Sequence, residues 1–286
     1  MRLVFLGTPE PAAAALRSIV AAGHDVALVV TRADKRRGRN AAPSPSPVKA
    51  TAVELGLPVT TRIEDVLDAG AKLGVVVAFG RIIKDEILDQ MPMVNAHFSL
   101  LPRWRGAAPV ERAVLAGDTE TGVCLMAIDA GLDTGPVYRC EKVSIGSEET
   151  ADQLRERLSE LSARMLVEAL ETGLGEPVPQ EGEPTYAAKL EPAELHLNWE
   201  RPAAELHRVV RVGRAWTSLR GRRLLVLEAR VVDRSGGAPG SLDGSVVSAG
   251  DGGLELLRVQ PEGRPALPAV DWLRGARPAP GEVLGA

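Results

Sequence analysis

Short apolar runs alternate with segments of helical period from residue 1 to residue 181. The runs are rich in Val and Ile, which is typical of buried strands in a parallel sheet whose faces are covered by helices. Predicted strands span residues 3–6, 26–31, 75–79 and 94–97, and predicted helices span residues 11–20, 48–55 and 82–88. This pattern predicts an α/β domain with a mostly parallel sheet.

The clearest helical pattern begins near Thr150. Its apolar positions form a single stripe, while Arg and Glu occupy the opposite face. The stripe consists of Leu154, Leu158, Leu161, Met165 and Leu166. We expect this stripe to pack into the core of the first domain.

Beyond residue 195 the pattern changes to short strands separated by glycine-rich turns. The preceding stretch, 173–192, is rich in Gly, Pro and Glu and has no periodicity, as is typical of a linker. A predicted helix at 202–212 is followed by predicted strands at 223–232, 244–248 and 254–260. This spacing predicts a small C-terminal β-barrel.

The length of 286 residues agrees with two domains, because a single hydrophobic core stops growing at about 250 residues. Hydrophobic residues make up 45% of the chain and charged residues 25%, which is ordinary for globular proteins. We expect a first domain at 1–183, a linker at 184–200 and a second domain at 201–286.

Charge and cysteine content suggest a protein of the cytoplasm. The net charge is only −4, so a nucleic-acid partner would have to be found from local basic regions. The N-terminal apolar run is too short for a signal peptide or a membrane span. Cys124 and Cys140 have no metal-type companions, and we expect them to be buried, reduced thiols.

The first strand-to-helix turn, Gly7-Thr8-Pro9-Glu10-Pro11, argues against two common enzyme classes. It has one glycine where a dinucleotide-binding turn needs three, and it lacks the Lys-Ser/Thr pair of a phosphate-binding loop. A nicotinamide-dependent or ATP-dependent enzyme is therefore disfavoured.

Asn95 and His97 lie two positions apart at the end of a predicted strand, so their side chains should point to the same face. Amide and imidazole N–H groups suit an oxyanion that develops when a nucleophile adds to a carbonyl. Taken alone, the pair is as compatible with a capping Asn and a hydrogen-bonded core His.

Two glycine-rich turns strengthen the functional interpretation. Residues 98–109 form a Pro-, Gly- and Arg-rich loop after the predicted strand, where open parallel sheets bind ligands. Residues 129–136 form a second turn that carries Asp133, which could orient a nearby histidine and favour its charged form. The alternative for Asp133 is a purely turn-forming role.

The segments NAHFSLLPRWRGAAP at 95–109 and GLDTGP at 131–136 resemble the folate-dependent formyltransferases, in particular those that act on methionyl-tRNA. The resemblance extends from the Gly7 turn to the turn at 261–263. It implies a Rossmann-like formyltransferase domain followed by an OB-like, tRNA-binding β-barrel domain. Pro11 and Phe98 depart from the usual family pattern and affect the aminoacyl pocket more than the chemistry, and Gly213-Arg214 replaces an Asn-Pro pair ahead of Trp216.

The resemblance also implies roles for individual residues. Asn95, His97 and Asp133 would be catalytic: the first two would stabilise the tetrahedral oxyanion, and Asp133 would orient His97 and assist removal of the amine proton. The tetrahydrofolate site would include Ser99, Leu100, Leu101 and Pro102, together with Phe79, Gly80, Arg81 and Ile82. The donor would be 10-formyltetrahydrofolate, and we expect no metal, since His24, His196 and His207 lack companions at ligand spacing.

The resemblance implies methionyl initiator tRNA as the acceptor, and two basic regions agree with it. Residues 32–39 hold five basic side chains against one acid, and the family's tRNA-binding members carry a basic insertion here. The residues 201–230 hold eight arginines against two glutamates. The predicted tRNA contacts are Lys35, Arg36, Arg37, Arg39, Arg208 and Arg211. Either region could instead be an ordinary solvated surface.

Three rival functions remain open. An amino-sugar N-formyltransferase would share Asn95, His97 and Asp133 but would not need the basic insertion. A folate-binding or RNA-binding module would not need the catalytic residues, and a hydride-transfer enzyme would need the missing glycines. The sequence determines neither the oligomeric state, for which we expect a monomer, nor the isomer of the Leu101-Pro102 bond.

Overall fold

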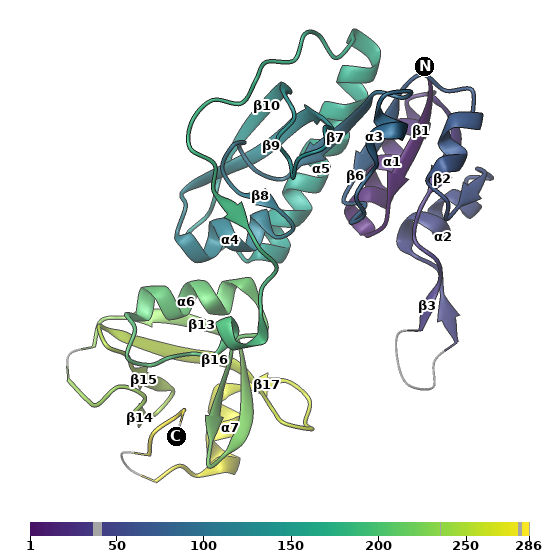
Figure 1. Ribbon diagram of the computed structural model, residues 1–286. Coiled ribbons are helices and arrows are strands. Elements are labelled where there is room, and N and C mark those ends of the chain that lie inside the picture. The colour runs from purple at the N-terminus through teal and green to yellow at the C-terminus, as the bar shows by residue number, and fades with distance from the viewer. Residues whose placement is uncertain (37–41, 235, 280–281, 286) are drawn as a thin grey trace. The chain divides into compact units, whose positions relative to one another are not determined.

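The computed structural model describes residues 1–36, 42–234, 236–279 and 282–285 (Figure 1). The chain forms two compact units, each assembled from separated stretches. The first comprises residues 1–110, 120–144 and 154–188, and the second comprises residues 111–119, 145–153 and 189–286. Each unit has its own sheet and its own hydrophobic core.

The first unit is built on a seven-stranded sheet with the order β10-β9-β7-β6-β1-β2-β5. The strands are β1 (Arg2–Gly7), β2 (Asp25–Val30), β5 (Val59–Thr60), β6 (Gly74–Val77), β7 (Met93–His97), β9 (Glu120–Ala127) and β10 (Val137–Ser144). Strands β5, β2, β1, β6 and β7 are parallel, whereas β9 and β10 are antiparallel. The prediction of a mostly parallel, Rossmann-like sheet is confirmed.

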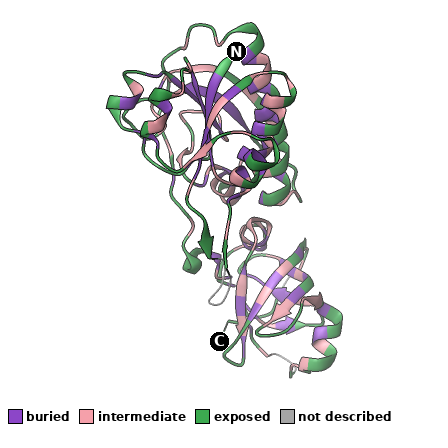
Figure 2. Ribbon diagram, turned by 90° about the vertical axis from the view of Figure 1, so that its right-hand side faces the viewer, coloured by how far each residue is buried: buried purple, intermediate pink, exposed green. Residues whose placement is uncertain are grey.

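Helices cover the sheet and account for its burial (Figure 2). They are α1 (Glu10–Ala21), α2 (Pro47–Glu54), the 3-10 helix η1 (Glu64–Asp68), α3 (Asp85–Leu88) and α5 (Ala151–Thr172). Helix α4 (Pro109–Ala116) lies mostly in the stretch 111–119 of the second unit. Helices α1 and α2 each carry proline in the first turn, where the missing N–H is harmless. The predicted stripe on α5 is buried, from Leu154 at 0% exposure to Leu161 at 8%.

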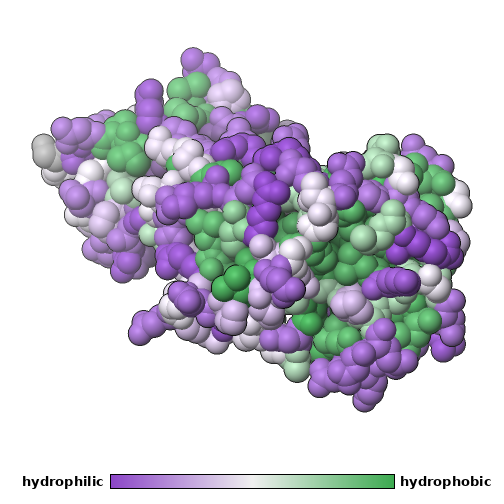
Figure 3. Space-filling model, turned by 90° about the horizontal axis from the view of Figure 1, so that it is seen from above, coloured by the Kyte–Doolittle hydropathy of each residue, from purple (hydrophilic) through white to green (hydrophobic). Residues whose placement is uncertain are grey.

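Helix α3 is shorter than predicted because residues 82–84 do not belong to it. Ile82 instead projects into solvent, with 91% of its surface exposed. Other large apolar residues are also exposed, among them Leu132 at 61% and Tyr186 at 60%. Figure 3 shows apolar surface interspersed with polar side chains on the face that it presents.

The expectation of two reduced thiols is wrong for this structure, which joins Cys124 and Cys140 in a disulfide. The two residues are direct partners across β9 and β10, with their Cα atoms 4.1 Å apart. Such directly opposed residues of an antiparallel pair bring their Cβ atoms close enough for this bond. Cys124 is fully buried, whereas Cys140 is exposed.

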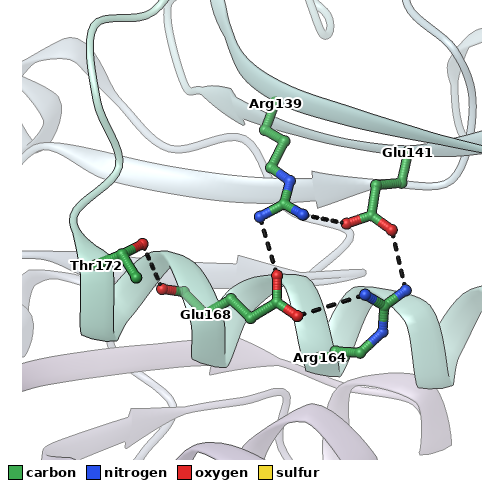
Figure 4. Close-up of polar contacts among 5 residues, drawn as sticks. All are labelled: Arg139, Glu141, Arg164, Glu168 and Thr172. Atoms are coloured by element: carbon green, nitrogen blue, oxygen red, sulfur yellow. Dashed lines mark hydrogen bonds and ion pairs between the residues drawn. The ribbon is translucent and has the colours of Figure 1, made fainter.

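Four charged residues join β10 to α5 on the sheet face that α5 covers (Figure 4). Arg139 contacts Glu141 at 2.6 Å and Glu168 at 2.9 Å, and Arg164 contacts the same two carboxylates at 2.9 and 3.4 Å. The neighbouring guanidinium of Arg164 is held charged, because hydrogen bonding and attraction by Glu141 raise its pKa. Each carboxylate therefore bridges two guanidinium groups.

The second unit contains a six-stranded antiparallel sheet with one core. Its strands are β12 (Trp216–Leu219), β13 (Arg222–Val232), β14 (Leu242–Asp243), β15 (Val246–Ser248), β16 (Gly253–Pro261) and β17 (Leu267–Pro268). The order is β12-β13-β16-β15-β14, and β17 pairs with β16. The helices are η2 (Pro192–Leu195), α6 (Ala203–Val212) and α7 (Ala269–Ala276). The expected C-terminal domain of short antiparallel strands is confirmed.

Two short strand pairs lie outside these sheets. Strands β3 (Lys35–Arg36) and β4 (Pro43–Ser44) form a small hairpin that projects away from the sheet after β2 (Figure 1). Strands β8 (Arg105–Gly106) and β11 (Tyr186–Ala187) pair in parallel. Among the described helices, none combines the length and apolar character needed to cross a bilayer.

Candidate active site

The carboxyl ends of β1, β6 and β7 meet at one edge of the first sheet, because these three strands are neighbours and parallel. Open parallel sheets bind their ligands at this edge. Gly7 ends β1 in a position without room for a side chain, since a Cβ atom there would lie 2.6 Å from the Ala12 Cβ. The chain turns sharply after β6, where Ala78 has φ 45° and Gly80 has φ 72°.

The segment 79–82, expected to help hold folate, lies at this edge directly after β6. Phe79 is buried, and its carbonyl accepts a hydrogen bond of 3.3 Å from the Thr8 hydroxyl. The Arg81 guanidinium lies 5.4 Å from the centre of the Phe79 ring and donates to the carbonyl of Thr61. Gly80 and Ile82 are exposed beside this anchored pair.

Asn95 and His97 both lie on β7 and, being two positions apart, share one face of the strand. Asn95 is half-buried and His97 is 6% exposed. Within the part of the chain that the structure describes, the Asn95 amide has no hydrogen-bond partner. Its N–H groups are therefore available to a substrate oxygen.

The structure brings His97 and Asp133 together, although they are far apart in sequence. Nδ1 of His97 lies 3.6 Å from Oδ2 of Asp133, and the two side chains are only 7% and 18% exposed. The same carboxylate oxygen accepts a hydrogen bond of 2.8 Å from the backbone N–H of Gly106. Asp133 itself has the left-handed φ of 53°, which is unusual for a residue with a side chain.

His97 makes a second contact that the sequence did not predict. Its Nε2 atom lies 2.9 Å from the carbonyl oxygen of Trp104. A carbonyl can only accept, so Nε2 carries the hydrogen and donates it. Both ring nitrogens thus have partners, and the predicted oxyanion role of His97 requires that the Trp104 contact be exchanged for one with substrate. Asn95 is the donor that is free without such a change.

The loop after β7 is held by its own backbone and side chains. The buried Ser99 hydroxyl donates to the carbonyl of Arg103 at 2.6 Å. Leu100 packs over Gly122, where an added Cβ would lie 2.6 Å from its side chain. The Leu101-Pro102 bond is cis. Ser99 and Leu100 therefore shape the loop, while Leu101 and Pro102 are half-buried at its turn.

Arg105 and Gln180, which no sequence pattern singled out, connect this loop to the turn around Asp133. The Gln180 carboxamide donates to the carbonyls of Asp133 and Gly135 and accepts two hydrogen bonds from Arg105. The stretch that contains Gln180 reads as a linker because it has no periodicity. In the structure it bonds to the loop, and Thr185 accepts a hydrogen bond of 2.8 Å from the N–H of Trp104.

The first basic region lies partly in the β3–β4 hairpin. Lys35 and Arg36 are exposed on β3, whereas the predicted contacts Arg37 and Arg39 lie outside the described residues. Lys49, at the start of α2, forms an ion pair of 2.8 Å with Asp34 and ties the base of the hairpin to that helix. The hairpin that carries the exposed Lys35 and Arg36 is therefore held at its base by this ion pair.

In the second basic region, the predicted tRNA contacts Arg208 and Arg211 are not free on the surface as expected. Arg208 on α6 donates to the carbonyl of Ala116, and Arg211 donates to those of Glu149 and Gly146 at 2.8 Å. Burial lowers the pKa of Arg211, and the neighbouring carboxylates of Glu148 and Glu149 partly offset this effect. Both guanidinium groups thus bind backbone carbonyls of the second unit rather than pointing freely into solvent.

Over residues 1–36, 42–234, 236–279 and 282–285, no group of three or more His, Cys, Asp or Glu side chains is arranged to hold a metal ion. The arrangement at the sheet edge offers other chemistry. It combines a free amide donor, a histidine that donates from Nε2 and a carboxylate near its Nδ1. These groups suit addition of an amine to an activated carbonyl carbon.

Comparison with known proteins agrees with this chemistry. Residues 1–170 match the family model described as formyl transferase, and residues 189–277 match that of the formyl transferase C-terminal domain. The methionyl-tRNA formyltransferase of Dinoroseobacter shibae is 46% identical over 292 residues, which cover 96% of this chain and 97% of the relative. Because this match covers nearly the full length of both proteins, no large segment of this chain is left unmatched.

Solved structures share the fold at low sequence identity. The Helicobacter canadensis N-formyltransferase, in a complex with folinic acid and dTDP-3-aminofucose, superposes with a TM-score of 0.71 at 18% identity, covering 91% of this chain and 98% of that one. The methionyl-tRNA formyltransferase from Clostridium thermocellum gives 0.60 at 17% identity, covering 80% and 93%. With two matching family models and a full-length relative, the chain belongs to the formyltransferase family.

Proposed function

We propose that this chain transfers the formyl group of 10-formyltetrahydrofolate to the α-amino group of methionyl initiator tRNA. The observation that carries the reaction is the grouping of Asn95, His97 and Asp133 at the carboxyl edge of the sheet. The acceptor is supported by relatives named methionyl-tRNA formyltransferase, which are 42% to 46% identical over nearly the whole chain. The reaction would take place in the cytoplasm, with the protein acting as a monomer.

In the proposed reaction the neutral amine attacks the formyl carbon, and a C–N bond forms as the carbonyl becomes a tetrahedral oxyanion. The Asn95 amide donates to that oxygen, and His97 joins it after releasing the Trp104 carbonyl. The Asp133 carboxylate accepts the amine proton, directly or through a water. The bond between carbon and folate N10 then breaks, N10 gains a proton, and tetrahydrofolate leaves.

The folate would lie against the two segments that follow β6 and β7. The pteridine would contact backbone at 79–82, where Gly80 is exposed beside the buried Phe79. The loop 99–102 would cover its other side. Because folate brings an activated one-carbon unit, the protein has to supply position and electrostatic stabilisation.

The tRNA would be held by phosphate contacts from exposed cations. Lys35 and Arg36 are the predicted contacts of the first basic region that the structure describes, and Arg37 and Arg39 would extend it. In the second region Arg208 and Arg211 would have to release carbonyl partners first. Contacts there are better assigned to the following exposed arginines: Arg214, Arg222 and Arg223.

The test is a formylation assay with purified protein and 10-formyltetrahydrofolate. Charged initiator tRNA, the corresponding elongator methionyl-tRNA and a nucleotide-linked amino sugar are offered in parallel. Formylation of the initiator species alone supports the proposal. Activity on the sugar alone would retain the reaction and overturn the acceptor, and no activity on any of the three would overturn both.

A matched pair of variants tests the basic hairpin. Lys35→Ala should weaken tRNA binding and reduce the slope of log affinity against log salt by about one. Lys72→Ala removes an exposed lysine that precedes β6, at the opposite edge of the sheet, and should leave that slope unchanged. Equal slopes for both variants and the parent would remove Lys35 from the proposed tRNA contacts.

A further inference from the structure

Gln180 occupies the centre of a closed set of hydrogen bonds around the candidate site. Its Nε2 donates to the carbonyl of Asp133 at 2.9 Å and to that of Gly135 at 2.8 Å. Its Oε1 accepts from Nε and from the terminal nitrogen of Arg105 at 3.0 and 2.7 Å. We propose that Gln180 is a positioning residue that sets the distance between Asp133 and His97; this inference rests on the function proposed above.

The orientation of the Gln180 amide is determined by its partners. Two carbonyl oxygens require donors, and the Arg105 guanidinium, which has only donors, requires an acceptor. Turning the amide over would place its oxygen against two oxygens and its NH₂ against a cation. A carboxamide is therefore the only common side-chain group of this length that satisfies both sides at once.

The bonds close into a ring because Arg105 and Gly106 are consecutive. Arg105 reaches the Asp133 turn through Gln180, while the N–H of Gly106 donates directly to Oδ2 of Asp133. Strand β8, formed by these two residues, is in turn paired with β11, six residues after Gln180. Strand β8 thus holds the Asp133 carboxylate directly, through Gly106, and the Asp133 carbonyl indirectly, through Arg105 and Gln180.

This support matters because Asp133 adopts a conformation that it would otherwise avoid. Its φ of 53° lies in the left-handed region, which residues with a side chain adopt only uncommonly. Gly135 restricts the same turn, since a Cβ atom there would lie 1.9 Å from the carbonyl of Ala127. Without the two N–H donors of the Gln180 amide, the carbonyls of Asp133 and Gly135 lose these hydrogen bonds, and the turn loses this support.

A small movement of this turn would change the chemistry directly. His97 Nδ1 lies 3.6 Å from the Asp133 carboxylate. A displacement of about 1 Å in a positioned group can reduce turnover about a hundredfold. Gln180 does not contact the reacting atoms in this proposal; it acts through Asp133.

The decisive variant is Gln180→Glu. Glutamate keeps the length and the contact with Arg105 but replaces both donors with an oxygen that repels the carbonyls of Asp133 and Gly135. We expect kcat to fall about tenfold to a hundredfold, while the folate dissociation constant and the melting temperature change little. Gln180→Met, which keeps the length without polar atoms, should lower kcat to a similar degree. The matched control is Gln90→Glu, because Gln90 is an exposed glutamine whose side chain donates to the nearby Glu86 carbonyl on α3.

A spectroscopic readout separates this inference from the proposed function. The chain has four histidines, so their ring signals can be resolved by NMR without any substrate. In Gln180→Glu the His97 signals should shift, and those of His24, His196 and His207 should not. If the wild-type protein formylated no acceptor but the His97 signals shifted, the proposed function would fail and the positioning role would stand.

Two results would overturn the inference. One is a Gln180→Glu variant with wild-type kcat and unshifted His97 signals. The other is a parallel loss of kcat, folate affinity and melting temperature in both Gln180 variants, which would indicate that the residue only stabilises the fold.

Discussion

Cys124 lies directly opposite His97 across the antiparallel strands β9 and β7. Cys140 lies opposite Cys124 on the next strand, so all three side chains belong to the same face of the sheet. Arg139 and Glu141, the neighbours of Cys140, point to the other face and form ion pairs with α5 (Figure 4). The disulfide is therefore one strand away from the candidate histidine.

Reduction of this disulfide should destabilise the first unit. The cysteines are separated by 16 positions in sequence, and opening a loop of that length costs about 3 kcal/mol in the chain-entropy account. Thermal melts with and without a phosphine reductant should differ by several degrees, because 1 kcal/mol corresponds to about 2–4 °C in a unit of this size. The Cys124→Ser, Cys140→Ser double variant should not respond to reductant. Two titratable thiols in the untreated protein would contradict the disulfide.

Asp133→Asn should lower kcat by about 10² to 10⁴ while the folate dissociation constant changes much less. The amide retains an oxygen that can accept from Gly106, but it cannot accept the amine proton. Steady-state kinetics and equilibrium folate binding measure the two effects separately. Asp25→Asn is the control, because Asp25 forms an exposed pair with Arg2. Equal losses of turnover and folate affinity would refute the separate role of Asp133.

Glu141→Gln should weaken the ion-pair network between β10 and α5, since Glu141 contacts both Arg139 and Arg164. These groups are partly exposed, so the loss should be no more than about 1 kcal/mol. Urea unfolding at low and high salt would test this, because screening should shrink the difference from wild type. A difference that persists unchanged at high salt would indicate packing rather than charge.

The second unit should lose stability as the pH falls below about 6.5, the ordinary value for histidine. Burial lowers the pKa of His207, although the Glu148 carboxylate at 3.3 Å raises it in part. The unfolded chain therefore binds a proton at a higher pH than the folded chain does, and stability declines from pH 6.5 down to the folded pKa. Urea unfolding between pH 5 and 7.5 should show a smaller pH slope in His207→Gln. An identical slope in the variant would assign the effect to other groups.

The parts of the fold that the sequence predicts are those with local periodicity. Strand β1 is a continuous apolar run, and helices α1 and α5 each bury one repeating set of apolar positions. The predicted ends of β1 and α1 and the predicted start of α5 agree with the structure to within one residue. Asn95 and His97 were placed at the end of β7 by the same alternation. Strand β10 was missed because its exposed side carries charged residues, which gives no apolar run.

The contacts that organise the site have no local pattern. Arg105 and Gln180 are separated by 75 positions, and Trp104 and Thr185 by 81. The contact between Trp104 and His97 uses a backbone carbonyl, which every residue possesses. Side-chain identity therefore indicated which groups could react, whereas their hydrogen-bond partners became known only from the three-dimensional arrangement.

The ring of hydrogen bonds around Gln180 joins residues that are far apart in sequence, and this separation has a consequence for the synthesis of the enzyme. Asp133 is synthesised 47 positions before Gln180, an interval of roughly two to ten seconds at ordinary rates of translation. During that time the growing chain already contains Asn95, His97 and Asp133 but lacks the residue that closes the ring. The order of synthesis therefore delivers the reactive groups before their support, and the site is completed only when the last stretch of the first unit leaves the ribosome.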